Sequence, residues 1–446
     1  MKKFVSLLFI ATVFCIVLSE DYLTIYNNNQ GLFKTNIELD LQRGIQYHSI
    51  ENIPTSIVRE SVIFLPNDSN VNLFSQNFEY DLADSQKMLR KYIDKNVKIY
   101  TDDEMFQGTL MFFDNRSYGL LNETTNELHI INAPRVNNIF LSEMPDDFYT
   151  KPTLRWQLAA NRAGKYQADL SYLTGGIQWR ATYNAVIRKN DFTLNSWVTI
   201  NNTSGKDYRN VNLKLIAGEV QTHQNLANRS SSQQLIVREA RSGASAPSFE
   251  EREFSDFRIY TLDQKADVDN NQEKQLSLYP LKNVKYTREY EYRVQGNTVD
   301  IFISFKNSTA EGLGVPLPRG NVNFYEIDEK DGTQQFVGVA TIANTSMNQD
   351  VSLKIGSAFD IIGRTTTTNA SNQNNVREAD YEVSLTNNKS EAVEVEVIRL
   401  LQNVNTEILN PSIPFEKINA NTIVFRVGLD PGQERKITFK ERIINQ

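Results

Sequence analysis

Three histidines are the side chains of this 446-residue chain that are best suited to acid–base chemistry: His48, His129 and His223. Nucleophilic catalysis of the Ser-His-Asp kind needs a nucleophile within hydrogen-bond reach of such a histidine. None of the three lies beside a G-x-S-x-G segment, and the zinc-binding pattern H-E-x-x-H does not occur in the sequence. We therefore interpret these histidines as structural or solvent-exposed, and the catalytic residues of any reaction stay unknown.

Paired carboxylates are the second candidate chemistry, because two of them can act as acid and base on a glycosidic bond. Neighbouring residues on a strand point to opposite faces, so adjacent acids are not a preassembled pair. The sequence favours solvated loop charges, and a carboxylate-dependent hydrolase acting on glycan or peptide is the alternative. The acids concerned are Asp102, Asp103, Asp146, Asp147, Glu250, Glu251 and Asp256.

Two acidic runs contain the oxygen ligands that calcium prefers, but neither has the spacing of an EF-hand loop. Gly312-Leu-Gly314 precedes Val and Pro rather than a helix, so it is not a phosphate-binding loop. The sequence therefore predicts no metal site and no cofactor. The two runs are Asp263, Asp267, Asp269 and Asn271, and Asp328, Glu329 and Asp331.

Three aromatic residues, Tyr172, Trp179 and Tyr183, are the candidate ligand-binding residues. If Gly175-Gly176 forms a two-residue type I′ turn, the flanking segments pair as a hairpin in which Tyr172 opposes Trp179. All three rings then share one face, where they could stack on a sugar or a peptide. Aromatic residues on one face of a sheet are more often core, and the sequence favours that interpretation.

Most of the chain alternates apolar and polar residues with the period of a β-strand. Val299, Ile301, Ile303 and Phe305, for example, share one face of an expected strand. One short helix is expected near 84–94, where apolar residues recur at helical spacing. The sequence thus predicts a mainly β, multidomain protein of antiparallel sheets.

The domain boundaries follow from shifts in composition and from strand spacing. Two polar stretches are interpreted as loops or linkers, one at 221–256 and the other from Arg364 to Ala379. The expected parts are a signal peptide at 1–19, an N-terminal β region with the short helix at 20–94, a small β-barrel-like region at 95–147, a central β domain at 148–375 with a polar linker at 221–256, and a C-terminal β-sandwich at 376–446.

The first residues have the pattern of a secretory signal peptide. Lys2 and Lys3 precede an apolar run that ends at Leu18, and the small residue Ser19 follows. The run is shorter than the roughly 20 residues that span a bilayer, so we predict cleavage after Ser19 rather than a membrane anchor. We expect a secreted, periplasmic or cell-envelope protein whose mature chain has no transmembrane span.

Composition narrows the expected partners. The only cysteine, Cys15, lies in the expected signal peptide, which excludes disulfides and thiol chemistry from the mature chain. The chain has 47 Lys and Arg against 54 Asp and Glu. Because affinity for phosphates comes from Lys and Arg, an acidic chain of this kind is a poor nucleic-acid binder. We expect an unknown protein or polysaccharide partner, and no nucleic acid.

Several segments resemble the domain of unknown function 4139 family, which also forms the C-terminal part of mucoidy-inhibitor-like proteins. The resemblance lies in Leu170–Trp179 (LSYLTGGIQW), Leu213–Val220 (LKLIAGEV) and Leu313–Gly320 (LGVPLPRG). Where the family often has His before its Tyr-Thr-Leu segment, this chain has Arg258. The resemblance implies an all-β secreted or envelope protein, and it implies no activity, substrate or catalytic residue.

The leading functional hypothesis is an exported, non-catalytic protein that binds or scaffolds at the cell envelope or outside. The hydrolase is one alternative. An accessory role in exopolysaccharide production, suggested by the resemblance to mucoidy-inhibitor-like proteins, is another.

Overall fold

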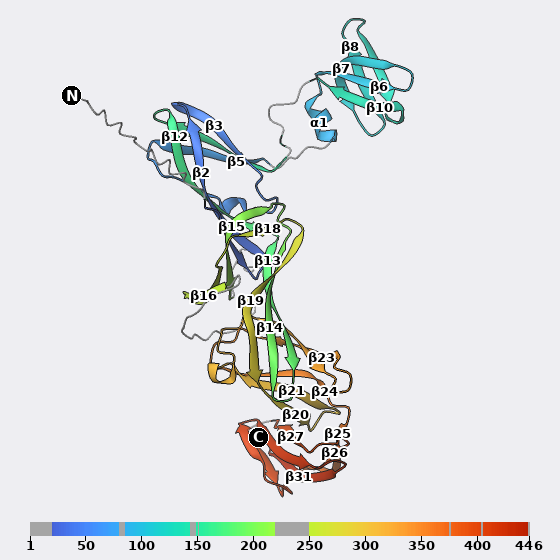
Figure 1. The fold of residues 1–446 in the computed structure, drawn as a ribbon. Helices are drawn as coiled ribbons and strands as arrows, with labels where there is room; N and C mark the ends of the chain where they lie inside the picture. Colours follow the sequence, from blue (N-terminus) through green and yellow to red (C-terminus); the bar gives the residue numbers. More distant parts are fainter. Residues whose placement is uncertain are drawn as a thin grey trace, which may run out of the picture.

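A computed structural model describes residues 20–79, 85–142, 149, 151–218, 249–373, 376–402 and 405–444. The expected signal peptide and Asp146-Asp147 lie outside these residues. The chain is mainly β, as the alternation predicts, and its sheets follow one another along an elongated molecule (Figure 1). Among the described residues, no helix has the length and apolar character needed to cross a membrane.

The first large sheet is built around the N-terminal strand. β1 (Tyr22–Tyr26) lies between two partners, parallel to β15 and antiparallel to β2, and it buries Leu23 and Ile25 completely. The strand order is β16 (Phe249–Phe254), β17 (Phe257–Leu262), β15 (Tyr208–Ala217), β1, β2 (Gln30–Leu41), β12 (Gly164–Gly175) and β4 (Ile63–Pro66), with β18 (Ala266–Val268) beside β15.

Two further sheets pack with the first around one continuous apolar core, to which Ile303, Phe305 and Leu353 of a fourth sheet also belong. One is three-stranded, and it contributes Trp156 and Leu158, which are fully buried. Its order is β3 (Gly44–Glu51), β11 (Thr153–Ala160) and β5 (Val71–Glu79). The other has the order β19 (Gln272–Lys285), β14 (Asp191–Asn202), β13 (Ile177–Ile187), β22 (Gly320–Ile327) and β23 (Gln334–Ile342).

The predicted hairpin at Gly175-Gly176 is wrong. β12 pairs with β2 and β4, whereas β13 pairs with β14 and β22, so the two strands belong to different sheets. Only Gly176 has a positive φ, of 72°, and a type I′ turn needs one at both positions. A Cβ on Gly176 would lie 2.9 Å from the carbonyl oxygen of Thr203, which also requires glycine there. The chain crosses between sheets at this point.

The C-terminal part is a β-sandwich, as predicted, with a core of its own. That core contains Tyr292 and Val299, so the sandwich draws strands from both sides of residue 376. One sheet has the order β24 (Asp350–Ser357), β21 (Val299–Lys306), β20 (Thr287–Arg293), β27 (Val393–Leu400), β30 (Thr422–Leu429) and β29 (Glu416–Asn419). The other has the order β25 (Ile361–Gln373), β26 (Val376–Asn387), β31 (Glu434–Ile444) and β28 (Thr406–Leu409).

The two polar stretches that were expected to be linkers have different outcomes. Arg364 to Ala379 forms most of the paired strands β25 and β26, so the linker prediction is wrong there. Its threonines are β-branched and suit a solvated edge strand, which polarity alone does not distinguish from a loop. Of the predicted linker at 221–256, residues 221–248 lie outside the described residues, and Phe249–Phe254 form β16.

Residues 85–142 form a small unit with a separate core that includes Val97, Ile99 and Leu110. The expected helix is confirmed and forms α1 (Ser85–Lys91). The strand order is β10 (Val136–Leu141), β6 (Asn96–Thr101), β7 (Met105–Phe113), β8 (Ser117–Asn122) and β9 (Glu127–Asn132). Because β9 and β10 do not pair, the region is an open sheet rather than a closed barrel. Short 3-10 helices are η1 (Arg59–Ser61), η2 (Ala133–Arg135) and η4 (Thr309–Glu311).

A buried asparagine ends a strand in the same way in two different sheets. Asn202 ends β14 and Asn387 ends β26, and neither is exposed to solvent. In both, Oδ1 accepts the backbone N–H two residues later and Nδ2 donates to the carbonyl four residues later. Nδ2 also donates to a carbonyl of a distant segment, at Val268 or at Leu429. Each asparagine thus ties the turn after its strand to a strand of another sheet.

We expect Asn387→Ala to destabilise the protein by about 1–3 kcal/mol, because it leaves buried carbonyl groups without a donor. Asn388 is adjacent in sequence but exposed, so Asn388→Ala is the matched control and should leave the midpoint unchanged. Urea unfolding followed by circular dichroism measures both variants. Equal midpoints for the two would contradict the structural role of Asn387.

Candidate binding site

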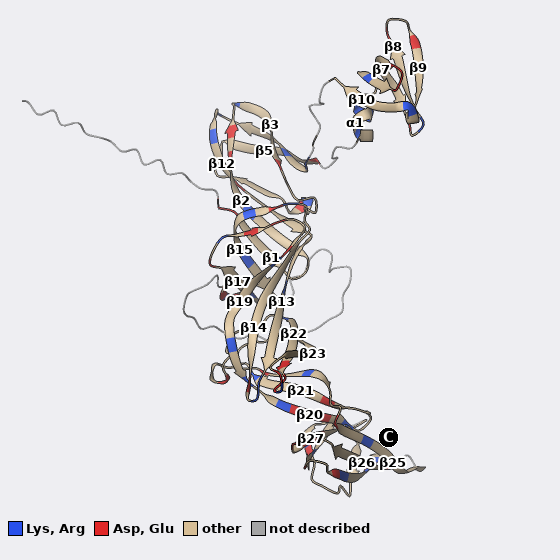
Figure 2. Cartoon of the chain, turned by 45° about the vertical axis from the view of Figure 1, so that its right-hand side comes forward, with Lys and Arg blue, Asp and Glu red and all other residues tan. Residues whose placement is uncertain are grey.

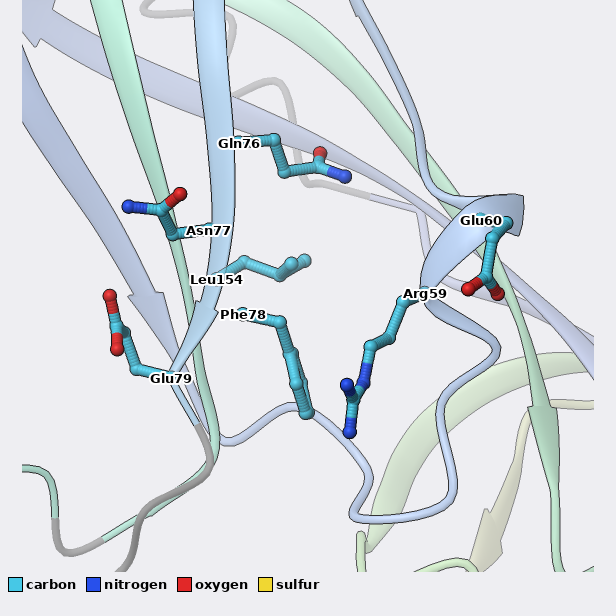
Figure 3. Close-up of a pocket in the computed structure, with 7 residues that line it drawn as sticks. All are labelled: Arg59, Glu60, Gln76, Asn77, Phe78, Glu79 and Leu154. Carbon is cyan, nitrogen blue, oxygen red and sulfur yellow. The ribbon is translucent and has the colours of Figure 1, made fainter.

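A groove of about 470 Å³ lies between η1 and the three-stranded sheet (Figure 3). One wall is η1, with Arg59 and Glu60, and the other is the end of β5, with Leu154 of β11 behind it. The β5 residues in this wall are Gln76, Asn77, Phe78 and Glu79. The groove therefore combines an amide-rich and acidic rim with an apolar floor.

Two contacts fix the positions of side chains that line the groove. Gln76 accepts a hydrogen bond of 2.8 Å from Nε1 of the buried Trp156, its cross-strand neighbour. The Arg59 guanidinium lies 5.2 Å from the centre of the Phe78 ring, a cation–π geometry that joins the two walls. Sequence reasoning missed this groove because its lining residues come from three separate segments and carry no motif.

The predicted ligand-binding residues lie elsewhere, inside the core. Tyr172, Trp179 and Tyr183 are each at most 3% exposed. Nε1 of Trp179 donates to the Ile216 carbonyl and the Tyr183 hydroxyl donates to that of Pro318. Burial raises the pKa of Tyr172 and of Tyr183. The rings offer no surface for a ligand in this structure, which agrees with their interpretation as core residues.

The histidines and carboxylates do not come together in the described part of the chain. His48 is half-buried in β3, and burial lowers its pKa. His129 lies in β9 with its ring 5.5 Å from that of Phe106, and His223 lies outside the described residues. Glu251 pairs with Arg258 at 2.6 Å. Among the described residues, no group of three His, Cys, Asp or Glu side chains could hold a metal ion.

The two acidic runs that were considered for calcium bind the protein's own groups. Asp267 accepts the backbone N–H of Asn210 at 2.7 Å, and Asp269 forms an ion pair of 2.9 Å with Arg209. Asp331 accepts both the backbone N–H and the hydroxyl of Thr333 in the turn between β22 and β23. These hydrogen bonds shape turns. Acidic and basic residues are otherwise scattered over the sheets (Figure 2).

The outer face of the small sheet is a second candidate surface, which we call the apolar face. Strand register places its members on one side: Tyr100 opposes Met105, and Leu128 and Ile130 are two residues apart on β9. Ile130 is 63% exposed and Phe140 is 57% exposed. The signal in the sequence is a loss of alternation, as in Leu128-His-Ile-Ile131. The apolar face comprises two groups, Tyr100, Met105 and Phe140 at one end and Phe112, Leu128 and Ile130 at the other, with the exposed residues Lys98 and Gln107 between them on the same side.

Together these features define a modular, mainly β protein with a groove at one sheet edge and an apolar face on a small open sheet. Residues 168–444 match the family described as Domain of unknown function (DUF4139), and the chain belongs to that family. A comparison with curated proteins finds no match. The family match begins within β12, so the groove and the apolar face precede it in the chain.

Proposed function

We propose that the chain is exported and acts as a binding protein at the cell envelope or outside the cell, with the apolar face as its contact surface. Export is supported by Lys2, Lys3, the apolar run to Leu18 and the small residue Ser19. The first sheet begins at Tyr22, so cleavage after Ser19 would leave the folded part of the chain intact.

The apolar face is the observation that carries the proposal. Groups of large apolar side chains exposed together on a sheet face mark interaction sites. The Tyr100 and Phe140 rings meet edge to face with their centres 5.1 Å apart, so the patch is packed as well as exposed. Aromatic residues and Met are enriched in the cores of protein interfaces. The composition of this face therefore favours a protein partner.

The test uses the full chain expressed with its N-terminal segment in the organism that encodes it. We expect mass spectrometry of the recovered protein to give the mass of a chain that begins at Glu20. We also expect the purified protein to sediment with the envelope fraction. The double variant Ile130→Lys with Phe140→Lys should reduce sedimentation about tenfold, because charges in an apolar interface are costly.

The matched control is Leu281→Lys, which replaces an equally exposed apolar side chain on β19. This variant should sediment as the unchanged protein does. Protease treatment of the envelope should abolish binding, and persistence after that treatment would identify a polysaccharide instead. A protein that stays inside the cell with Met1 attached, or equal sedimentation of all variants, would refute the proposal.

A further inference from the structure

The groove beside β5 follows the edge of a sheet. β5 pairs only with β11, and no described strand pairs with its other edge. Four consecutive β5 residues line the groove, although successive residues of a strand point to opposite faces. In Figure 3, Gln76 and Phe78 point toward η1, and Asn77 and Glu79 point the other way. A groove that touches both faces runs along the backbone edge between them.

We propose that this edge binds an extended peptide as a fourth strand of the three-stranded sheet. In this mode the main chain of the peptide hydrogen-bonds to the exposed backbone groups, and its alternate side chains meet the two faces. Four residues of strand span about 13 Å. The groove volume falls within the usual range of ligand sites. η1 lies on the side toward which Gln76 and Phe78 point, so the side chains of the added strand on that face would meet η1.

The charges of the groove select the kind of peptide. Glu60 stands on the η1 wall and Glu79 at the end of β5, so the described lining carries two carboxylates. Among the described lining residues the one cation is Arg59, and it lies over the Phe78 ring. Phe78 and Leu154 supply an apolar floor on the inner side. The lining therefore suits a peptide that alternates apolar side chains with lysine or arginine.

Fluorescence anisotropy with the full mature chain tests the proposal. The probe is a short labelled peptide in which valine alternates with lysine. We expect saturable binding, and about tenfold weaker binding when the lysines are replaced by glutamates. Methylation of alternate backbone nitrogens should abolish binding, because it removes the donors that pair with a strand edge.

Glu79→Lys and Glu51→Lys form a matched pair of variants. Both glutamates lie opposite Thr153, one on each edge of the same sheet, but only Glu79 borders the groove. Glu79→Lys should reverse the preference from the lysine peptide to the glutamate peptide, and Glu51→Lys should leave it unchanged. Absence of saturable binding, equal binding of the methylated peptide, or equal effects of the two variants would overturn the proposal.

The proposal for the groove and the proposal for the apolar face can be refuted independently. The variant Ile130→Lys with Phe140→Lys should bind the lysine peptide normally, and Glu79→Lys should sediment normally with the envelope. Peptide binding tests the groove and sedimentation tests the apolar face. A negative result in one experiment therefore leaves the other proposal standing.

Discussion

Replacing Arg399 by methionine is expected to destabilise the C-terminal sandwich by about 3–5 kcal/mol, because it leaves a buried carboxylate without its cation. Arg399 on β27 and Glu441 on β31 are 3% and 2% exposed and join the two sheets of the sandwich. Nε of Arg399 donates to Oε2 of Glu441 at 3.0 Å, and Nη2 donates to the same oxygen. The guanidinium also lies 4.8 Å from the centre of the Tyr381 ring.

A double variant separates the charge effect from packing. Arg399→Met with Glu441→Leu removes both charges, and it should recover most or all of the stability lost by Arg399→Met. The recovery is favoured because Oε1 of Glu441 has no hydrogen-bond partner among the described residues, so the pair is incompletely satisfied. Lys436→Met is the control: Lys436 pairs with Glu382 on the surface of the same sheet, and its loss should not move the transition.

Calorimetry and near-ultraviolet dichroism measure these variants best. The three tryptophans lie at positions 156, 179 and 197, within the strands β11, β13 and β14, so their fluorescence does not report on the sandwich that contains Arg399. Tyr381 stacks on Phe439 with ring centres 5.3 Å apart and supplies a near-ultraviolet signal there. A double variant as unstable as Arg399→Met would show that lost packing, rather than an unpaired charge, sets the cost.

The sequence predicts which side chains are buried far better than which strands pair. Tyr172 and Trp179 are buried as their alternation indicates, yet they lie in different sheets. Alternation is a property of one strand and its two faces, so it survives when the strand finds a distant partner. The parallel pairing of β1 with β15 joins residues about 190 positions apart in the chain, and no local pattern specifies it.

The two candidate binding surfaces differ in how far the sequence reveals them. The apolar face has a local signature, because β9 is apolar on both sides near Leu128 and Ile130. The groove has none, since Glu60, Phe78 and Leu154 meet only after β5 pairs with β11 and η1 closes the other side. A site on one sheet face can be predicted from the residue pattern of a single strand. A site between separate elements cannot, because it forms only when the topology brings those elements together.

Trp179→Ala is expected to cost about 3–5 kcal/mol, since it opens a large cavity in the core to which four sheets contribute. Trp179 is 3% exposed on β13, and its ring meets that of Tyr260 edge to face with centres 6.1 Å apart. Its Nε1 donates to the Ile216 carbonyl at 3.1 Å, so the substitution also leaves a buried acceptor without its donor. The residue therefore joins the β13 sheet to the β15 sheet by both packing and hydrogen bonding.

Trp197→Ala is the matched control, because it removes the same side chain from the neighbouring strand. Trp197 lies on β14 opposite Thr182, on the face away from Trp179, and it is only half-buried. We expect a clearly smaller loss from Trp197→Ala in urea unfolding followed by the fluorescence of the remaining tryptophans. If Trp179→Ala left the midpoint in place, the ring would be a surface platform after all, and the assignment of β13 to the centre of the core would fail with it.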